Sequence, residues 1–338
     1  MKKTLILLLA AILLVAVSSL QFGCKKDDTA ETPGVLVPVY PVSATVLNPQ
    51  GQPQGGALLM LQNPPAQAGT FSAYTDTAGK ATIQSPAGAQ VLIAKMGTVF
   101  QATINVNVAA SSTPTNAGTL QLQQNTSLGK VLVVKADCEQ LEAVLRVIGY
   151  STFDSSYIDA LRDSANTDST KLLTYLRQYA LIFSDCHCGT EGGSNYAVLS
   201  RTYGRYVAGG GKIYGGHYNY YHLQRVWPPY YRSTDAQYAP SRDSIKIVDP
   251  TLAGWVGFTV ASWDSSTDSR KLSGYEKFTD LPPGSKVYAT IFWTNPQIAI
   301  IVENYSGGGK YLWTDYHNQD IKDYPQLVKL VKYFLYSL

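Results

Sequence analysis

Three histidines and three cysteines of this chain stand where predicted strands end. Cys138 follows one such strand, the run Cys-His-Cys at 186–188 follows the next, and His217 and His317 come after two later ones. Imidazole and thiol groups act as general acids and bases, as nucleophiles, and as ligands of zinc or copper. Cysteines also form disulfides, and histidines also form hydrogen bonds within polar loops. The role of these side chains therefore depends on the helices and strands that position them.

Strands and helices alternate from residue 129 onwards. The continuous β-branched run at 130–137 is typical of a strand buried on both faces, and residues 141–148 carry apolar positions at helical spacing. The alternation continues with an extended segment at 152–153, helices at 169–179 and 195–211, strands at 180–185 and 212–215, and a closing strand and amphipathic helix. This pattern predicts an α/β doubly wound, flavodoxin-like domain over 129–338, with a β-rich insertion at 236–300. Ligands of such sheets bind outside the carboxyl ends of the strands, where we expect the histidines and cysteines to gather.

The stretch GGGKIYGGHYNYYH at 209–222 joins a predicted helix to a predicted strand. Its first three glycines are expected to end the helix, and the absence of Gly-Lys-Ser/Thr excludes a phosphate-binding P-loop motif. Gly215 and Gly216 allow a sharp turn that presents His217 at the strand tip. The alternative is that His217 only forms hydrogen bonds within a polar loop.

Aromatic and acidic residues supply further candidates for ligand contact. The tyrosines and tryptophan near the turn can stack on sugar faces or can simply pack, and they are Tyr214, Tyr218, Tyr220, Tyr221, Trp227, Tyr230 and Tyr231. The acidic residues Asp163, Asp168 and Asp185 have no EF-hand register and are expected to face solvent.

The first residues are typical of an exported lipoprotein. Lys2 and Lys3 precede an apolar run shorter than the roughly 20 residues that a membrane-spanning helix needs, so 1–23 is predicted to be a signal peptide. The residues before Cys24 resemble a bacterial lipobox, which implies cleavage before Cys24 and its acylation with palmitate. More than one acyl chain gives stable membrane anchoring. A plain signal peptide, with Cys24 left as an ordinary thiol, is the alternative.

Residues 24–39 are predicted to be a tether. Its charged start resembles the tag of outer-membrane lipoproteins that are displayed on the cell surface, and a hydrophilic tether facing the periplasm is the alternative. In that oxidising compartment we expect Cys138 to form a disulfide with Cys186 or Cys188. The C-x-C spacing is not that of a zinc ribbon, so no cofactor is predicted, and zinc or copper held by Cys186, Cys188 and His217 is the alternative.

Residues 40–124 change to short alternating runs separated by turn residues. Such runs predict an antiparallel β-sandwich. The succession of a strand, NPQGQP, a strand and TDTAGKA resembles the carboxypeptidase-regulatory-like (transthyretin-like) domain, which implies a spacer or stabilising module. An immunoglobulin-like sandwich has a similar pattern and remains the alternative.

Residues 129–338 resemble the class I glutamine-amidotransferase-like superfamily, and within it the ThuA-like (trehalose-utilisation) proteins. The resemblance rests on YVAGGGKIYGGHYNYY around His217 and on GGGKYLWTDYHNQD around His317. It places His217 at the position of the nucleophilic cysteine, His317 at the triad histidine and Gln319 at the triad glutamate. Imidazole forms no thioester, and an amide does not orient a base as a carboxylate does. The resemblance therefore implies that glutaminase activity is lost.

Two classes of function follow. The first is a non-catalytic module that binds a carbohydrate or a cell-surface protein partner, with the candidate contacts Tyr218, Tyr221, Asp185, Gln319 and Asp320. The second, implied by the ThuA-like resemblance, is an enzyme acting on sugars or keto-sugars. In that enzyme His217 and His317 would be acid/base groups, helped by Asp185 or Asp320.

The charge balance bears on the partners. The chain has 338 residues and a formal net charge of +3, which falls to +1 when Lys2 and Lys3 leave with the signal peptide. Nucleic-acid-binding domains carry clustered Lys and Arg and a strong positive charge, so a nucleic-acid partner is excluded.

Overall fold

The computed structural model describes residues 36–137, 140–187, 193–216, 219–226, 233–237, 242–264, 275–278, 285–291, 297–304, 307–314 and 325–338. The predicted signal peptide, Cys24 and most of the tether lie outside these residues. The chain divides into the units Met1–Pro38 and Val39–Leu338, and all elements below belong to the second. Within the described part of the chain, no helix is long and apolar enough to cross a bilayer.

Residues 39–124 form strands only. They are β1 (Val39–Leu47), β2 (Leu58–Leu61), β3 (Ser72–Tyr74), β4 (Lys80–Pro86), β5 (Gly88–Met96), β6 (Phe100–Val108), β7 (Thr115–Gln121) and β8 (Gln123–Gln124). They make one sheet in the order β4-β1-β7 and another in the order β3-β2-β5-β6-β8. The pair β1–β7 is parallel, so the prediction of purely antiparallel pairing is wrong there. Alternate residues of both sheets, such as Val42, Leu59 and Leu92, belong to one hydrophobic cluster.

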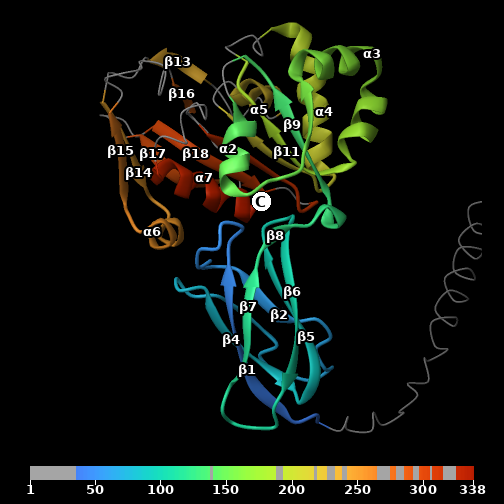
Figure 1. Cartoon of the computed structure of the whole chain (residues 1–338). Coiled ribbons are helices and arrows are strands. Elements are labelled where there is room, and N and C mark those ends of the chain that lie inside the picture. Colours follow the sequence, from blue (N-terminus) through green and yellow to red (C-terminus); the bar gives the residue numbers. More distant parts are fainter. Residues whose placement is uncertain are drawn as a thin grey trace, which may run out of the picture. The chain divides into compact units, whose positions relative to one another are not determined.

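The second part of the chain carries one large sheet (Figure 1). Its first elements are β9 (Lys130–Lys135), α2 (Leu141–Ile148), β10 (Asp154–Tyr157), α3 (Ile158–Leu176), β11 (Tyr179–Ser184), α4 (Ala197–Ala208), β12 (Lys212–Gly215) and α5 (Tyr220–Val226). The chain closes with β19 (Lys310–Thr314) and α7 (Pro325–Ser337). The neighbours β10-β9-β11-β12-β19 are all parallel. This is the flavodoxin-like strand order, and it confirms the predicted parallel sheet.

The β-rich insertion extends the same sheet. It contributes β14 (Arg242–Ile247), α6 (Pro250–Val256), β15 (Val260–Asp264), β17 (Lys286–Ile291) and β18 (Gln297–Asn304), while β13 (Ser233–Gln237) pairs separately with β16 (Tyr275–Phe278). The order continues from β19 as β18-β17-β14-β15, and every one of these pairs is antiparallel.

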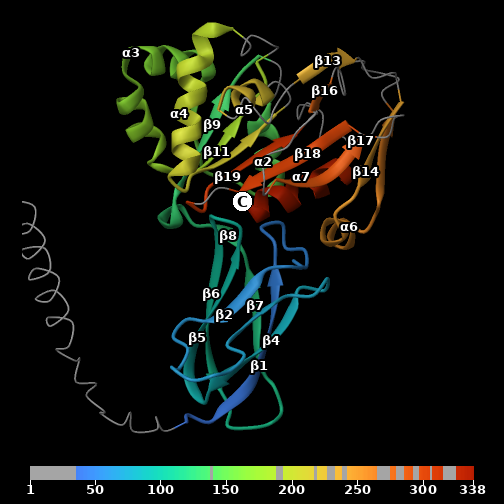
Figure 2. The ribbon, with the colours of Figure 1, turned by 180° about the vertical axis from the view of Figure 1, so that it is seen from behind.

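The parallel strands are buried on both faces. Along β9, Val131 and Val133 join one hydrophobic cluster, whereas Leu132 and Val134 join another. The first cluster includes apolar residues of α2 and α7, and the second includes those of α3 and α4. Figure 2, seen from behind, has α3 and α4 in front of the strands that α2 and α7 cover in Figure 1. Coverage of both faces explains why these strands have continuous apolar sequences.

Two predicted boundaries are corrected. Helix α3 begins at Ile158, well before the predicted helix at 169–179, and is kinked at Asp168, whose side chain accepts hydrogen bonds from the amides of Thr170 and Lys171. Within the insertion predicted as β-rich, residues Pro250–Val256 form helix α6 instead. Asp249 caps that helix by accepting from the Leu252 amide at 2.7 Å.

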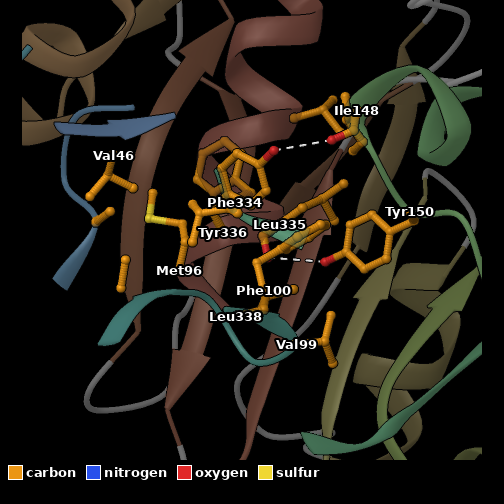
Figure 3. Close-up of a cluster of buried hydrophobic side chains, with 14 of the residues drawn as sticks. Val46, Met96, Val99, Phe100, Ile148, Tyr150, Phe334, Leu335, Tyr336 and Leu338 are labelled. Carbon is orange, nitrogen blue, oxygen red and sulfur yellow. Dashed lines mark hydrogen bonds between the residues drawn. The ribbon is translucent and has the colours of Figure 1, made fainter. Parts of the chain in front are cut away.

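The closing helix α7 packs against both parts of the chain (Figure 3). Its Tyr336 hydroxyl donates to the Ile148 carbonyl at 3.0 Å, and the Tyr150 hydroxyl donates to the Leu335 carbonyl at 3.4 Å. Phe100, next to the β5–β6 turn, stacks edge-on with Tyr150 and Tyr336. These aromatic contacts join the small sheets and the large sheet in one hydrophobic cluster.

Candidate functional site

The strand order places the topological switch point of the sheet between β9 and β11, and we name this position the β9–β11 crevice. The chain passes from β9 to β10 on one side and returns to β11 on the other, which makes this the switch point where α/β sheets bind ligands. Asp137 follows β9, and Asp185, Cys186 and His187 follow β11. The Asp185 amide donates to the Val134 carbonyl at 2.9 Å, so the two strand ends lie side by side.

Asp185 is a buried acid at this crevice. The residue is 1% exposed, and its Oδ1 accepts from the Leu141 amide at 3.3 Å. Its Oδ2 is buried without a hydrogen-bond partner among the described residues. Burial, and then the charge of Glu142, raise the pKa of Asp185 to about 7, against the smaller lowering effect of the Leu141 and Ala136 amides. The expectation that Asp185 faces solvent is therefore wrong.

His187 is the centre of a chain of polar contacts. Its Nε2 lies 3.1 Å from Oδ2 of Asp137, whose side chain is 75% exposed. Its Nδ1 lies 3.0 Å from the hydroxyl of Tyr196, which donates to Oδ1 of Asp159. Arg162 donates to the same Asp159 oxygen at 2.7 Å and lies over the Tyr196 ring. These polar contacts thus connect an exposed carboxylate, through a buried imidazole and a tyrosine hydroxyl, to a second carboxylate.

The partners of His187 come from three separate segments of the chain. Asp137 follows β9, Asp159 lies in the first turn of α3, and Tyr196 ends the turn before α4. We assigned the run at 186–188 to cysteine chemistry and noted His187 only as a further histidine at the strand edge. No sequence signal links Tyr196 or Asp159 to it, because the contacts depend on how α3 and α4 pack.

The chain turns closely at the end of β12, and the predicted presentation of His217 there lies outside the described residues. A Cβ atom on Gly215 would lie 2.8 Å from the Asn219 Cβ, so the close turn requires glycine there. The Asn219 amide group donates to the carbonyls of Ser184 and Asp185 at 3.2 and 3.0 Å, and its oxygen accepts from the Tyr311 hydroxyl. Asn219 therefore ties this turn to the end of β11.

A second buried histidine lies behind the crevice. Nδ1 of His222 in α5 is 2.8 Å from the Ser200 hydroxyl, and the ring stacks edge-on with Tyr203. Burial and the nearby charge of Arg225 lower the pKa of His222 to about 3, so this ring is neutral at physiological pH. Sequence analysis gave His222 no role, because an imidazole on a helix has no distinguishing spacing.

The other predicted site residues have different outcomes. Tyr214 is completely buried and offers no sugar-stacking face, whereas Tyr221 is partly exposed. Cys186 is fully buried, but the predicted disulfide of Cys138 with Cys186 or Cys188 stays a prediction, because Cys138 and Cys188 lie outside the described residues. Also outside them are Cys138, Cys188, His217, Tyr218, His317, Gln319 and Asp320.

A metal site also stays a prediction. The described residues include no cluster of three or more His, Cys, Asp or Glu side chains that could hold an ion. The zinc or copper alternative depends on Cys188 and His217, which are not among them.

The crevice brings together two kinds of chemical capability. Asp185, with a pKa of about 7, is able to donate or accept a proton near neutral pH. Its Oδ2 has unused acceptor capacity among the described residues, and the exposed carboxylate of Asp137 pairs with His187 at the same strand ends.

Neither protein-family models nor curated proteins match this chain. Solved structures overlap with it in part. A putative GMP synthase subunit from Thermoplasma acidophilum is 10% identical, with a TM-score of 0.41, and the match covers 61% of this chain and 92% of that one. A glutamine amidotransferase from Thermotoga maritima is 14% identical, with a TM-score of 0.40, over 61% of this chain and 84% of that one. A cytoplasmic protein from Salmonella typhimurium is 11% identical, with a TM-score of 0.41, over 87% of this chain and 98% of that one.

Proposed function

We propose that this protein is an outer-membrane lipoprotein, anchored through acylated Cys24 and displayed on the cell surface. A carboxypeptidase-regulatory-like sandwich over 40–124 acts as a spacer. Residues 129–338 form a degenerate class I amidotransferase-like, ThuA-like domain that binds a ligand at the β9–β11 crevice without transforming it.

One observation carries the binding role. Asp185 is buried at the switch point, yet its Oδ2 has no hydrogen-bond partner among the described residues. A buried polar atom without a partner costs stability, so a ligand that donates a hydrogen bond to it gains that energy on binding. Sugar hydroxyls are suitable donors, and the partly exposed Tyr221 offers an aromatic face in the adjoining helix.

Calorimetry with a panel of neutral mono- and disaccharides tests the binding role. We expect a sugar in the panel to bind wild type and to bind Asp185→Asn at least about tenfold more weakly, because the amide adds a donor where the ligand needs an acceptor. The matched control Asp163→Asn, which changes an exposed aspartate of α3, should bind as wild type does. Binding that is equal in Asp185→Asn would refute the crevice as the site.

A second candidate is an enzyme acting on sugars or keto-sugars, and the pKa of Asp185 near 7 favours it. In that case His217 and His317 are the acid/base groups and Asp185 assists. Alanine at either histidine should then lower turnover by about 10²–10⁴-fold. For a binding module the same substitutions change affinity only modestly. No glutamine hydrolysis is expected in either case, and ammonia release from glutamine that requires His317 would contradict the degenerate triad.

Anchoring has its own test. Mass spectrometry of membrane-extracted protein should find an acylated N-terminal Cys24, and Cys24→Ser should be released into the soluble fraction. Protease treatment of intact cells should digest the wild-type protein if it faces outward. Equal release of wild type and Cys24→Ser would contradict the anchor.

A further inference from the structure

A cavity lies where the parallel strand β12 begins, at the other end of the strand from the candidate site. It has a volume of about 710 Å³, within the ~300–1,000 Å³ typical of small-molecule sites. Its walls include Lys212, the first residue of β12, whereas the candidate site follows the last residues of the parallel strands. The remaining walls come from the sheet of β2, β3 and β5 and from helices α6 and α7.

The sheet wall is a row of three aligned side chains. Tyr74 of β3 pairs with Leu58 of β2, and Leu58 pairs with Lys95 of β5. Residues paired across neighbouring strands point to the same face, so this row presents an aromatic ring, an apolar side chain and a cation together. Tyr74 is 72% exposed, which leaves its ring available to a ligand.

The helix wall adds two more aromatic rings. Trp255 of α6 and Tyr333 of α7 stack edge-on, with ring centroids 5.5 Å apart. The Trp255 indole N–H donates to the Gly55 carbonyl at 3.2 Å, which fixes the ring beside the small sheet. Met96, Tyr336 and Leu338 also line the cavity, and Figure 3 shows them within the hydrophobic cluster at the end of α7.

The charged side chains that line the cavity are cations. Lys95 and Lys212 line it, and none of the described lining side chains is acidic. Leu338, the last residue of the sequence, adds a carboxylate group that accepts from Lys212, which leaves Lys95 as the cation without an acidic partner among the described lining residues. Lys212 is held in place, because its ammonium donates to the Thr98 hydroxyl at 2.8 Å and to the Leu338 main-chain oxygen. Lys95 makes no ion pair with any residue in the described ranges, so its charge is available to an anion.

We propose that this cavity is a binding site for an acidic saccharide. The faces of Tyr74 and Trp255 pack against the apolar face of a pyranose ring, and Lys95 pairs with its carboxylate. Aromatic rings supply apolar area together with a polar edge, which suits a sugar. The site is separate from the β9–β11 crevice and does not depend on the function proposed for that crevice.

Calorimetry with a galacturonate trisaccharide, compared with neutral maltotriose, tests the site. At low ionic strength the acidic trisaccharide should bind more tightly than the neutral one, and added salt should reduce the difference. Tyr74→Ala should weaken binding about tenfold through loss of the stacking face. Lys95→Gln should weaken binding of the acidic sugar about fivefold and leave the neutral one unchanged.

Two controls keep the result specific. Tyr157→Ala removes a tyrosine that is 65% exposed on β10, away from the cavity, and should bind as wild type does. Measured in an Asp185→Asn background, the losses in Tyr74→Ala and Lys95→Gln should persist, which separates this cavity from the β9–β11 crevice. Equal affinity for the two trisaccharides, absence of binding to either, or an equal loss in Tyr157→Ala would overturn the proposal.

Discussion

Nδ1 of His187 lies 3.0 Å from the hydroxyl of Tyr196, and that hydroxyl donates its hydrogen to Asp159. The hydroxyl oxygen therefore accepts from Nδ1–H, while Nε2 faces the carboxylate of Asp137. Arg162 also donates to the Tyr196 hydroxyl, at 3.3 Å. His187 and Tyr196 together therefore link Asp137, which follows β9, to Asp159 and Arg162 of α3.

Tyr196→Phe should destabilise the fold. The substitution keeps the ring but leaves His187 and Asp159 without their shared partner, which costs about 1–3 kcal/mol. Urea unfolding measures this loss. Tyr157→Phe is the matched control, because its ring is mostly exposed, and its free energy of unfolding should equal that of wild type. Equal values for the two variants would show that the hydroxyl of Tyr196 contributes nothing.

Asp185→Asn should change how stability depends on pH. The pKa of Asp185 is raised from 3.8 to about 7, so its contribution to stability is complete below pH 3.8 and is lost as the pH rises through 7. Relative to the variant, wild type should lose up to about 1.4 kcal/mol per pH unit across this window. Melting temperatures of the two proteins, compared along a pH series, give the difference. A constant difference would mean that Asp185 keeps an ordinary pKa.

His222→Gln should reveal the opposite slope. The pKa of His222 is lowered from 6.5 to about 3, so its contribution is complete above pH 6.5 and is lost as the pH falls. Relative to the variant, wild type should lose stability toward acid, whereas relative to Asp185→Asn it loses stability toward neutral pH. The two effects partly cancel in wild type. The same pH series, run on both single variants and on the double variant, separates them.

Gly215→Ala should distort the turn after β12. The added Cβ meets Asn219 at 2.8 Å, and such overpacking costs about 1–3 kcal/mol. Gly254→Ala is the matched control, because its Cβ meets nothing within 4 Å and lies inside α6. That control should gain about 0.5–1 kcal/mol from better helix propensity. Thermal unfolding of the two alanine variants compares the effects directly, and a gain for Gly215→Ala would contradict the close turn.

The parallel strands were predictable because burial on both faces leaves a continuous apolar run. The closeness of the ends of β9 and β11 was also predictable, because parallel strands of one sheet end on the same side of it. The first half of α3 was not predicted, because its apolar positions Ile158, Leu161 and Ala165 are few and lie among polar residues. Helix α6 was also missed, although Asp249, Pro250 and Gly257 are a recognisable start and end of a helix.

The polar contacts at the crevice were largely beyond prediction. Asp185 looked like one member of a solvated acidic run, and only the packing of α2 over the strand end buries it. His187 and Tyr196 meet because two helices are packed on one face of the sheet, and local sequence spacing does not encode such contacts.

Strand β12 has only four residues, and each of its ends is hydrogen-bonded or packed against another segment. Lys212 at its start bonds to Thr98 in the β5–β6 turn, and Gly215 at its end begins the turn that Asn219 ties to β11. Strand β12 therefore connects the β5–β6 turn to the end of β11 over four residues, and its pairing with β11 and β19 holds it in register on both sides. A change at Lys212 and a change at Gly215 consequently act on the same short segment, so the small sheets and the crevice share one structural support.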